Sequence, residues 1–92
     1  MTQRRLDLTK KASEFLSDLA AKQAKQQLDA ILKLFKNPRP HDSKELHGYK
    51  DLFRLDVGEY RIIYRYDDDT VFVTLIGKRN DGEVYKNLRR QS

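Results

Sequence analysis

Arginines that alternate with apolar residues are the side chains of this sequence best suited to chemistry. Arg54 and Asp56 precede a Gly-Glu pair at positions 58–59, and Arg61 follows it. A two-residue turn that begins with glycine favours a tight β-hairpin, and its register places Asp56 opposite Arg61. Because side chains alternate between the faces of a strand, these charged residues share one face. That face is either a phosphate-binding surface, since arginine pairs well with phosphate, or a solvated face on which Asp56 pairs with Arg61.

The residues between these charges predict where a core packs. They fall on the opposite face of the hairpin: Phe53, Leu55, Val57, Tyr60, Ile62 and Tyr64. Ile63 and Arg65 extend the arginine face instead. Because burial of unpaired charge is costly, we expect helices to cover the apolar face and the arginine face to stay open.

A second turn over residues 67–70 predicts a third strand. In that register Tyr66 pairs with Val71 and Arg61 pairs with Ile76. Arg79 then lies just beyond the end of the strand, near Arg61. The strand adds three residues to the apolar face: Val71, Val73 and Leu75.

The first part of the chain predicts two short helices. Residues 4–8 alternate weakly, as in an edge strand, and Thr9 is a helix N-cap residue. Apolar residues then follow helical spacing in two stripes: Ala12, Phe15, Leu16, Leu19 and Ala20, and after a phase slip at residues 21–23, Ala24, Leu28, Ile31, Leu32 and Phe35. Two helices joined by a very short turn are expected, and one bent helix is the alternative. The Asn-Pro-Arg-Pro sequence at 37–40 ends the helical region, and residues 41–48 are expected to form a polar connection.

These elements predict an α+β fold, with a helical hairpin at the N-terminus packed on one face of a small antiparallel sheet. The 92 residues are expected to form one domain, residues 1–92, because this length is close to that of a typical small domain. The segment from Asp81 onward fits either a helix or a strand.

Composition excludes several classes of protein. The absence of cysteine rules out a disulfide framework, a thiol nucleophile and a cysteine zinc site. No apolar stretch approaches the roughly 20 residues of a membrane-spanning helix, and the N-terminus does not resemble a secretory signal, so the cytoplasm is the expected compartment. A net charge of +5 favours a polyanionic or acidic partner, although a basic, soluble surface has the same composition.

No cofactor or metal is expected. The acidic run at residues 67–69 lacks the alternation and the glycine of a calcium loop, and it fits the tip of a hairpin better.

Several short motifs occur in a characteristic order and spacing: Leu46-x-Gly48, Phe53-Arg54-Leu55, Gly58-Glu59-Tyr60-Arg61-Ile62-Ile63-Tyr64, Ile76-Gly77-Lys78-Arg79 and Glu83-Val84-Tyr85. With the preceding helical hairpin, this set resembles the RelE/ParE superfamily of bacterial and archaeal toxins, and most closely its RelE side. The resemblance implies two helices on an antiparallel sheet and a cognate antitoxin that wraps over the toxin. It further implies a metal-independent ribonuclease that cuts mRNA in the ribosomal A site by attack of a ribose 2′-OH on the adjacent phosphate.

The resemblance also implies roles for individual residues. Arg61 matches the arginine that binds the scissile phosphate, and Tyr85 matches the tyrosine that orients or stacks on an mRNA base. Arg79 matches an arginine assigned to transition-state charge or leaving-group protonation; the first role is favoured, because arginine is a poor acid at neutral pH. Arg54 falls where the family has the first of two lysines, and Asp56 takes the place of the second. Asp56 is therefore either a general base or a partner of Arg61 that damps activity.

The remaining basic candidates would contact RNA phosphates: Lys44, Lys50, Lys78 and Lys86. Solvated lysines are the alternative for each of them. Two other functions stay open at this point. One is inhibition of DNA gyrase, as in ParE-like toxins, and the other is an attenuated toxin that mainly binds its antitoxin.

Overall fold

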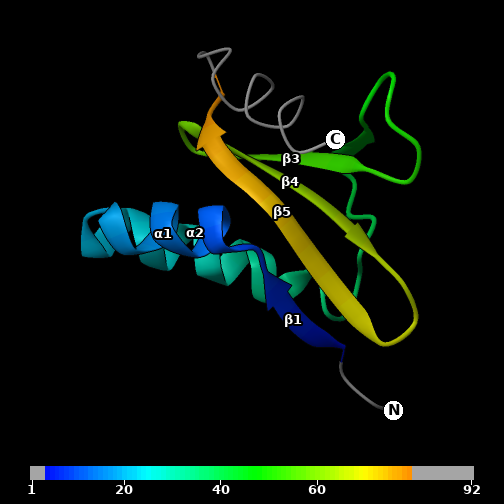
Figure 1. Cartoon of the computed structure of the whole chain (residues 1–92), viewed down its shortest axis with the longest axis horizontal. Coiled ribbons are helices and arrows are strands. Elements are labelled where there is room, and N and C mark those ends of the chain that lie inside the picture. Colours follow the sequence, from blue (N-terminus) through cyan, green and yellow to red (C-terminus); the bar gives the residue numbers. More distant parts are fainter. Residues whose placement is uncertain (1–3, 80–92) are drawn as a thin grey trace.

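The computed structural model describes residues 4–79 of the chain. Its elements run in the order β1 (Arg5–Leu8), α1 (Lys10–Asp18), α2 (Ala21–Lys33), β2 (Ser43–Glu45), β3 (Phe53–Val57), β4 (Tyr60–Tyr66) and β5 (Thr70–Lys78). The strands form one sheet in the order β1-β5-β4-β3-β2, and both helices lie on one side of it (Figure 1). The expected α+β fold is thus confirmed. Within residues 4–79, no helix combines the length and the apolar character that a membrane span requires.

The two ends of the sheet differ in detail from the expectation. The N-terminal strand β1 is an edge strand, but it runs parallel to β5, so the sheet is mixed rather than purely antiparallel. The other edge strand, β2, lies within residues 41–48, which the sequence indicated to be only a polar connection. A strand of three residues is too short to show the alternation that marks longer strands.

The helical hairpin is confirmed, with a break between Asp18 and Ala21. Thr9 caps α1, because its Oγ1 accepts a hydrogen bond from the backbone N–H of Ala12 at 3.1 Å. The same hydroxyl donates to the backbone oxygen of Thr74 at 2.6 Å. One side chain therefore fixes both the start of α1 and its position on β5.

The buried face of α2 is rotated from the expected one. Ile31 and Leu34 are fully buried, whereas Leu28 and Leu32 are 39% and 52% exposed, so their assignment to the core stripe was wrong. Gln27 is buried in their place, and its Nε2 donates to the backbone oxygen of Val57 at 3.0 Å. A polar side chain that satisfies a strand carbonyl is a tertiary contact, which hydrophobic spacing does not reveal.

An irregularity in the β4–β5 pairing changes which residues face the helices. Tyr66 pairs with Val71 as predicted, but beyond Tyr64 the register shifts, and Arg61 pairs with Gly77 instead of Ile76. The extra residue on β5 is Thr74, because the pairs on either side use residues 73 and 75. A β-bulge of this kind reverses the alternation that follows it.

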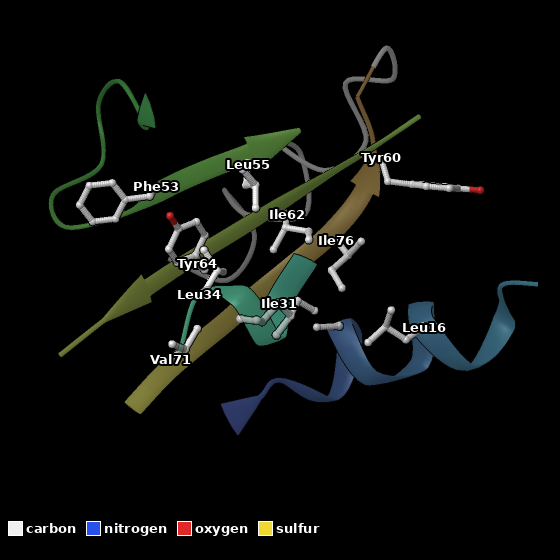
Figure 2. Close-up of a cluster of buried hydrophobic side chains, with 12 residues drawn as sticks. Leu16, Ile31, Leu34, Phe53, Leu55, Tyr60, Ile62, Tyr64, Val71 and Ile76 are labelled. Atoms are coloured by element: carbon white, nitrogen blue, oxygen red, sulfur yellow. The ribbon is translucent and has the colours of Figure 1, made fainter. Parts of the chain in front are cut away.

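The bulge produces two apolar clusters in place of one. Ile76, not Leu75, joins the main core between the sheet and the helices, so the expected place of Leu75 was wrong. Figure 2 shows this main core, to which both helices and three central strands contribute: Leu16, Ile31, Leu34, Phe53, Leu55, Tyr60, Ile62, Tyr64, Val71 and Ile76. Leu75 packs with Leu46 and Ile63 in a second, smaller cluster.

Tyr64 connects this core to the chain that leaves α2. Its ring is fully buried, and its hydroxyl donates to the backbone oxygen of Pro38 at 2.6 Å. Burial raises the pKa of the Tyr64 phenol, so it stays protonated as a donor. The hydrogen bond fixes the course of the chain from α2 to β2.

Alanine substitutions on the two faces of α2 should have different effects on stability. Ile31→Ala removes a fully buried side chain and should lower the free energy of unfolding by about 2–5 kcal/mol. Leu32→Ala, on the exposed face of the same helix, should change it by no more than about 0.5 kcal/mol. Urea denaturation of both variants measures the difference, and equal losses would contradict the helix orientation described above.

Candidate functional site

The β3–β4 hairpin brings Asp56 and Arg61 together as a cross-strand pair, as predicted. Arg61 Nε lies 2.6 Å from Asp56 Oδ1, and Nη2 lies 3.1 Å from Oδ2, which is a bidentate ion pair. The Arg61 side chain is only 14% exposed and that of Asp56 is 31% exposed. Partial burial with paired geometry strengthens such a contact relative to an ion pair in open solvent.

Two further guanidinium groups lie around the same carboxylate. Arg54 Nη1 is 4.0 Å from Asp56 Oδ2. Arg79 is fixed at the hairpin turn, since its backbone N–H donates to Glu59 O at 3.0 Å and its Nη1 donates to Gly58 O at 3.3 Å. We call Arg54, Arg61 and Arg79, with Asp56, the arginine cluster. Its three cations and one anion leave an excess of positive charge.

The charge of Asp56 follows from these neighbours. The hydrogen bond from Arg61 lowers its pKa below the ordinary value, partial burial opposes this effect, and the charges of Arg61, Arg79 and Arg54 add to the lowering. Asp56 is therefore ionised near neutral pH. A carboxylate with a lowered pKa is a weaker proton acceptor, so this environment favours Asp56 as the partner of Arg61 over Asp56 as a general base.

The lysines predicted to contact RNA lie on different parts of the structure. Lys44 on β2 pairs in register with Arg54 on β3, so it lies on the face of the arginine cluster. Lys78 is opposite Tyr60, a core residue, and so belongs to the other face of the sheet. Lys50 is exposed in the loop between β2 and β3. Tyr85 and Lys86 lie outside the described residues.

The arginine face is less open than the sequence indicated. Leu46, with Tyr49 and Leu52 packed around it, covers Ile63 and Leu75 on this face. Arg65, farther along β4, places its guanidinium 4.2 Å from the ring centre of Phe72. The apolar residues at positions 46, 49 and 52 are spaced three apart in the sequence. This spacing could have indicated that the segment covers part of the sheet, but the strand pattern alone did not include it. The candidate site is consequently confined to the end of the face near the 58–59 turn.

The described residues offer no evident metal site. Within residues 4–79, no group of three or more His, Asp or Glu side chains is placed to hold a metal ion. The acidic run at 67–69 forms the β4–β5 turn, in which Asp67 Oδ1 accepts hydrogen bonds from the backbone N–H groups of Asp69 and Thr70, both at 2.8 Å. Its role as a hairpin tip is confirmed.

Comparisons with known proteins agree with this architecture. A family model described as the ParE toxin of the type II toxin–antitoxin system, parDE, matches residues 6–82. No curated protein sequence is significantly similar to the chain. Among solved structures, a mutant of the E. coli toxin RelE in the free state superposes with a TM-score of 0.80 at 23% identity, over 98% of each chain.

Two other similar structures are complexes. The archaeal RelE–RelB complex from Pyrococcus horikoshii OT3 matches with a TM-score of 0.72 at 25% identity, over 85% of this chain and 97% of the other. The intact E. coli RelBE toxin–antitoxin complex matches with a TM-score of 0.71 at 25% identity, over 82% and 95%. Similar chains have thus been solved both alone and bound to antitoxins.

The Asp56 ion pair predicts a pH-dependent contribution to stability. Because the pKa of Asp56 is lower in the folded chain than in the unfolded one, its ionised form stabilises the fold above the unfolded pKa, and this contribution is lost as the pH falls through the folded pKa. Asp56→Asn should therefore lower Tm near neutral pH but not in strong acid. Calorimetry of both proteins over the acidic range measures the difference in Tm, and a difference independent of pH would contradict the assignment.

Proposed function

This chain belongs to the ParE toxin family of type II toxin–antitoxin systems, within the RelE/ParE superfamily, and from that premise we propose that it is an endoribonuclease that cuts mRNA in the ribosomal A site. The observation that carries the proposal is the arginine cluster. It brings Arg54 and Arg61 to one carboxylate at the end of a sheet face and holds Arg79 at the adjacent turn. The resulting excess of positive charge suits a phosphodiester.

The proposed reaction uses fixed charge rather than a metal. The ribose 2′-oxygen attacks the adjacent phosphorus, the bond from phosphorus to the 5′-oxygen breaks, and the products are a 2′,3′-cyclic phosphate and a free 5′-OH. The 2′-OH loses its proton and the 5′-oxygen gains one, so the step balances without a cofactor. Negative charge grows on the phosphate in the transition state, where preorganised cations have their largest effect.

Each arginine has a distinct place in this proposal. Arg61, oriented by Asp56, contacts the scissile phosphate, and Arg79 stabilises the developing charge from the turn. Arg54 and Lys44 extend the positive surface along the RNA backbone. The ribosome supplies the in-line geometry of the 2′-OH, which by itself is worth several kcal/mol.

Removal of either central arginine should abolish most of the cleavage. Arg61→Ala and Arg79→Ala are each expected to reduce the rate of mRNA cutting by about 10²–10³. Arg65→Ala is the matched control, because it removes the same charge from an exposed position of the same strand, against Phe72. Primer extension on a defined mRNA, with and without translating ribosomes, measures the cuts.

Inhibition of DNA gyrase is the second candidate function. The Arg61–Asp56 ion pair favours it, since the pair satisfies part of the guanidinium that a nuclease directs at its substrate, and the matching family model carries the ParE name. Toxicity that survives both arginine substitutions, together with blocked gyrase supercoiling, would identify this function. A protein that shows neither activity but binds its antitoxin would be an attenuated toxin.

Neutralisation of Asp56 tests whether the carboxylate damps the site. Asp56→Asn keeps an oxygen that can accept from Arg61 but removes the negative charge, so it should strengthen binding of the RNA phosphate, with KM falling about tenfold, equivalent to about 1.4 kcal/mol. Single-codon cleavage kinetics on programmed ribosomes measure KM and kcat separately. A large fall in kcat with unchanged KM would instead identify Asp56 as a working group in catalysis.

A further inference from the structure

A groove that shares Asp56 with the arginine cluster lies between α2, β3 and the chain at residues 40–42. Its volume is about 410 Å³, and its floor is apolar, with Leu34, Leu55 and Val57 contributing. Its rim carries Asp29 from α2, Asp42 and Asp56, together with Lys33 and Gln26. We call it the acidic groove. Because Arg61 balances the charge of Asp56, the negative charge of the rim comes from Asp29 and Asp42, against one ammonium group, on a chain whose net charge is +5.

Two of these carboxylates are available to a partner. Asp56 is engaged by Arg61 and Arg54, but neither Asp29 nor Asp42 forms an ion pair with any residue in the 4–79 range. Both are exposed at the surface. A cationic group placed between them would gain charge–charge attraction without breaking an existing contact.

The groove also borders the end of β3, where the pairing with β2 stops. The short strand β2 pairs with β3 only from Phe53 to Leu55, so β3 continues through Asp56 and Val57 with no strand beside it on the groove side. The Val57 oxygen is covered by Gln27 of α2, and Asp56 lies nearer to the end of β2. The apolar floor beside the charged rim favours the side chain of a peptide, with its aliphatic stem and charged end, over a small ion as the occupant.

We propose that the acidic groove receives an extended segment of the cognate antitoxin that carries an arginine or lysine side chain. The aliphatic part of such a side chain fits the apolar floor, while its charged end reaches Asp29 and Asp42. RNA is the less favourable occupant, because the rim carboxylates repel phosphates. An antitoxin is a partner of this class of toxin, as the RelE–RelB complexes illustrate.

An antitoxin segment in the groove would lie next to the arginine cluster. Asp56 belongs to both, since it lines the groove and binds Arg61. A cation bound in the groove competes for the negative charge of Asp56, so antitoxin binding and anion binding at the arginine cluster are expected to influence each other. The proposal itself concerns antitoxin binding and holds whether the toxin acts on mRNA or on gyrase.

Removal of the two available carboxylates tests the proposal. The double variant Asp29→Asn, Asp42→Asn should bind the purified cognate antitoxin about 10–100-fold more weakly than the wild type and with a smaller dependence of Kd on salt, because each lost ion pair weakens the interface. Titration calorimetry at two salt concentrations measures Kd. The control is Asp68→Asn, Asp69→Asn, which makes the same charge change at the exposed β4–β5 turn.

Circular dichroism and toxicity in the absence of antitoxin establish that both double variants fold and act. Charge exchange identifies the contact: Asp29→Lys should weaken binding, and an arginine-to-aspartate change at the matching antitoxin position should restore it. Wild-type affinity in the groove variant would overturn the proposal. So would a gain in RNA binding with unchanged antitoxin affinity, which would assign the groove to nucleic acid instead.

Discussion

The turn at residues 58–59 is the constraint on which the functional end of the molecule depends. Gly58 has a φ of +60°, a conformation that favours glycine, and this closes β3 onto β4 in the register that pairs Asp56 with Arg61. The turn also supplies both carbonyl oxygens that fix Arg79. From the other side of the sheet, Gln27 of α2 binds the carbonyl of the preceding residue, Val57. This one turn thus aligns α2, β3, β4 and the end of β5 around the candidate site.

The bulge at Thr74 has an equally broad effect on the two faces of the sheet. It allows Ile76 to enter the main core while Leu75 turns to the opposite face, where a small cluster beneath Leu46 covers part of the arginine surface. The bulged residue, Thr74, also contacts α1, because its carbonyl oxygen accepts a hydrogen bond from the side chain of the N-cap residue Thr9. The same irregularity that limits the charged face therefore positions the first helix.

The arginine cluster and the acidic groove carry opposite charge and share Asp56. A carboxylate in this position has two consequences. It orients Arg61 and reduces the positive charge that a phosphate would meet, and it also lines the groove in which we place a basic peptide. Under the two proposals, binding of a polyanion and binding of an antitoxin are linked through one side chain.

Local patterns in the sequence determined much of this structure. Strand alternation and a glycine turn predicted the β3–β4 hairpin and the Asp56–Arg61 pair, and Thr9 predicted the start of α1, because these features depend on neighbours within a few residues. The second turn, at residues 67–70, predicted the third strand and with it the place of Arg79 near Arg61.

Tertiary contacts decided the rest. The parallel pairing of β1 with β5, the rotation of α2 toward Gln27, the bulge at Thr74 and the separation of Lys78 from the arginine face all depend on segments far apart in the chain. Only when the sheet and helices pack together do buried carbonyls require partners and side chains compete for the core. The hydrophobic periodicity of a single segment does not depend on those contacts and therefore cannot predict them.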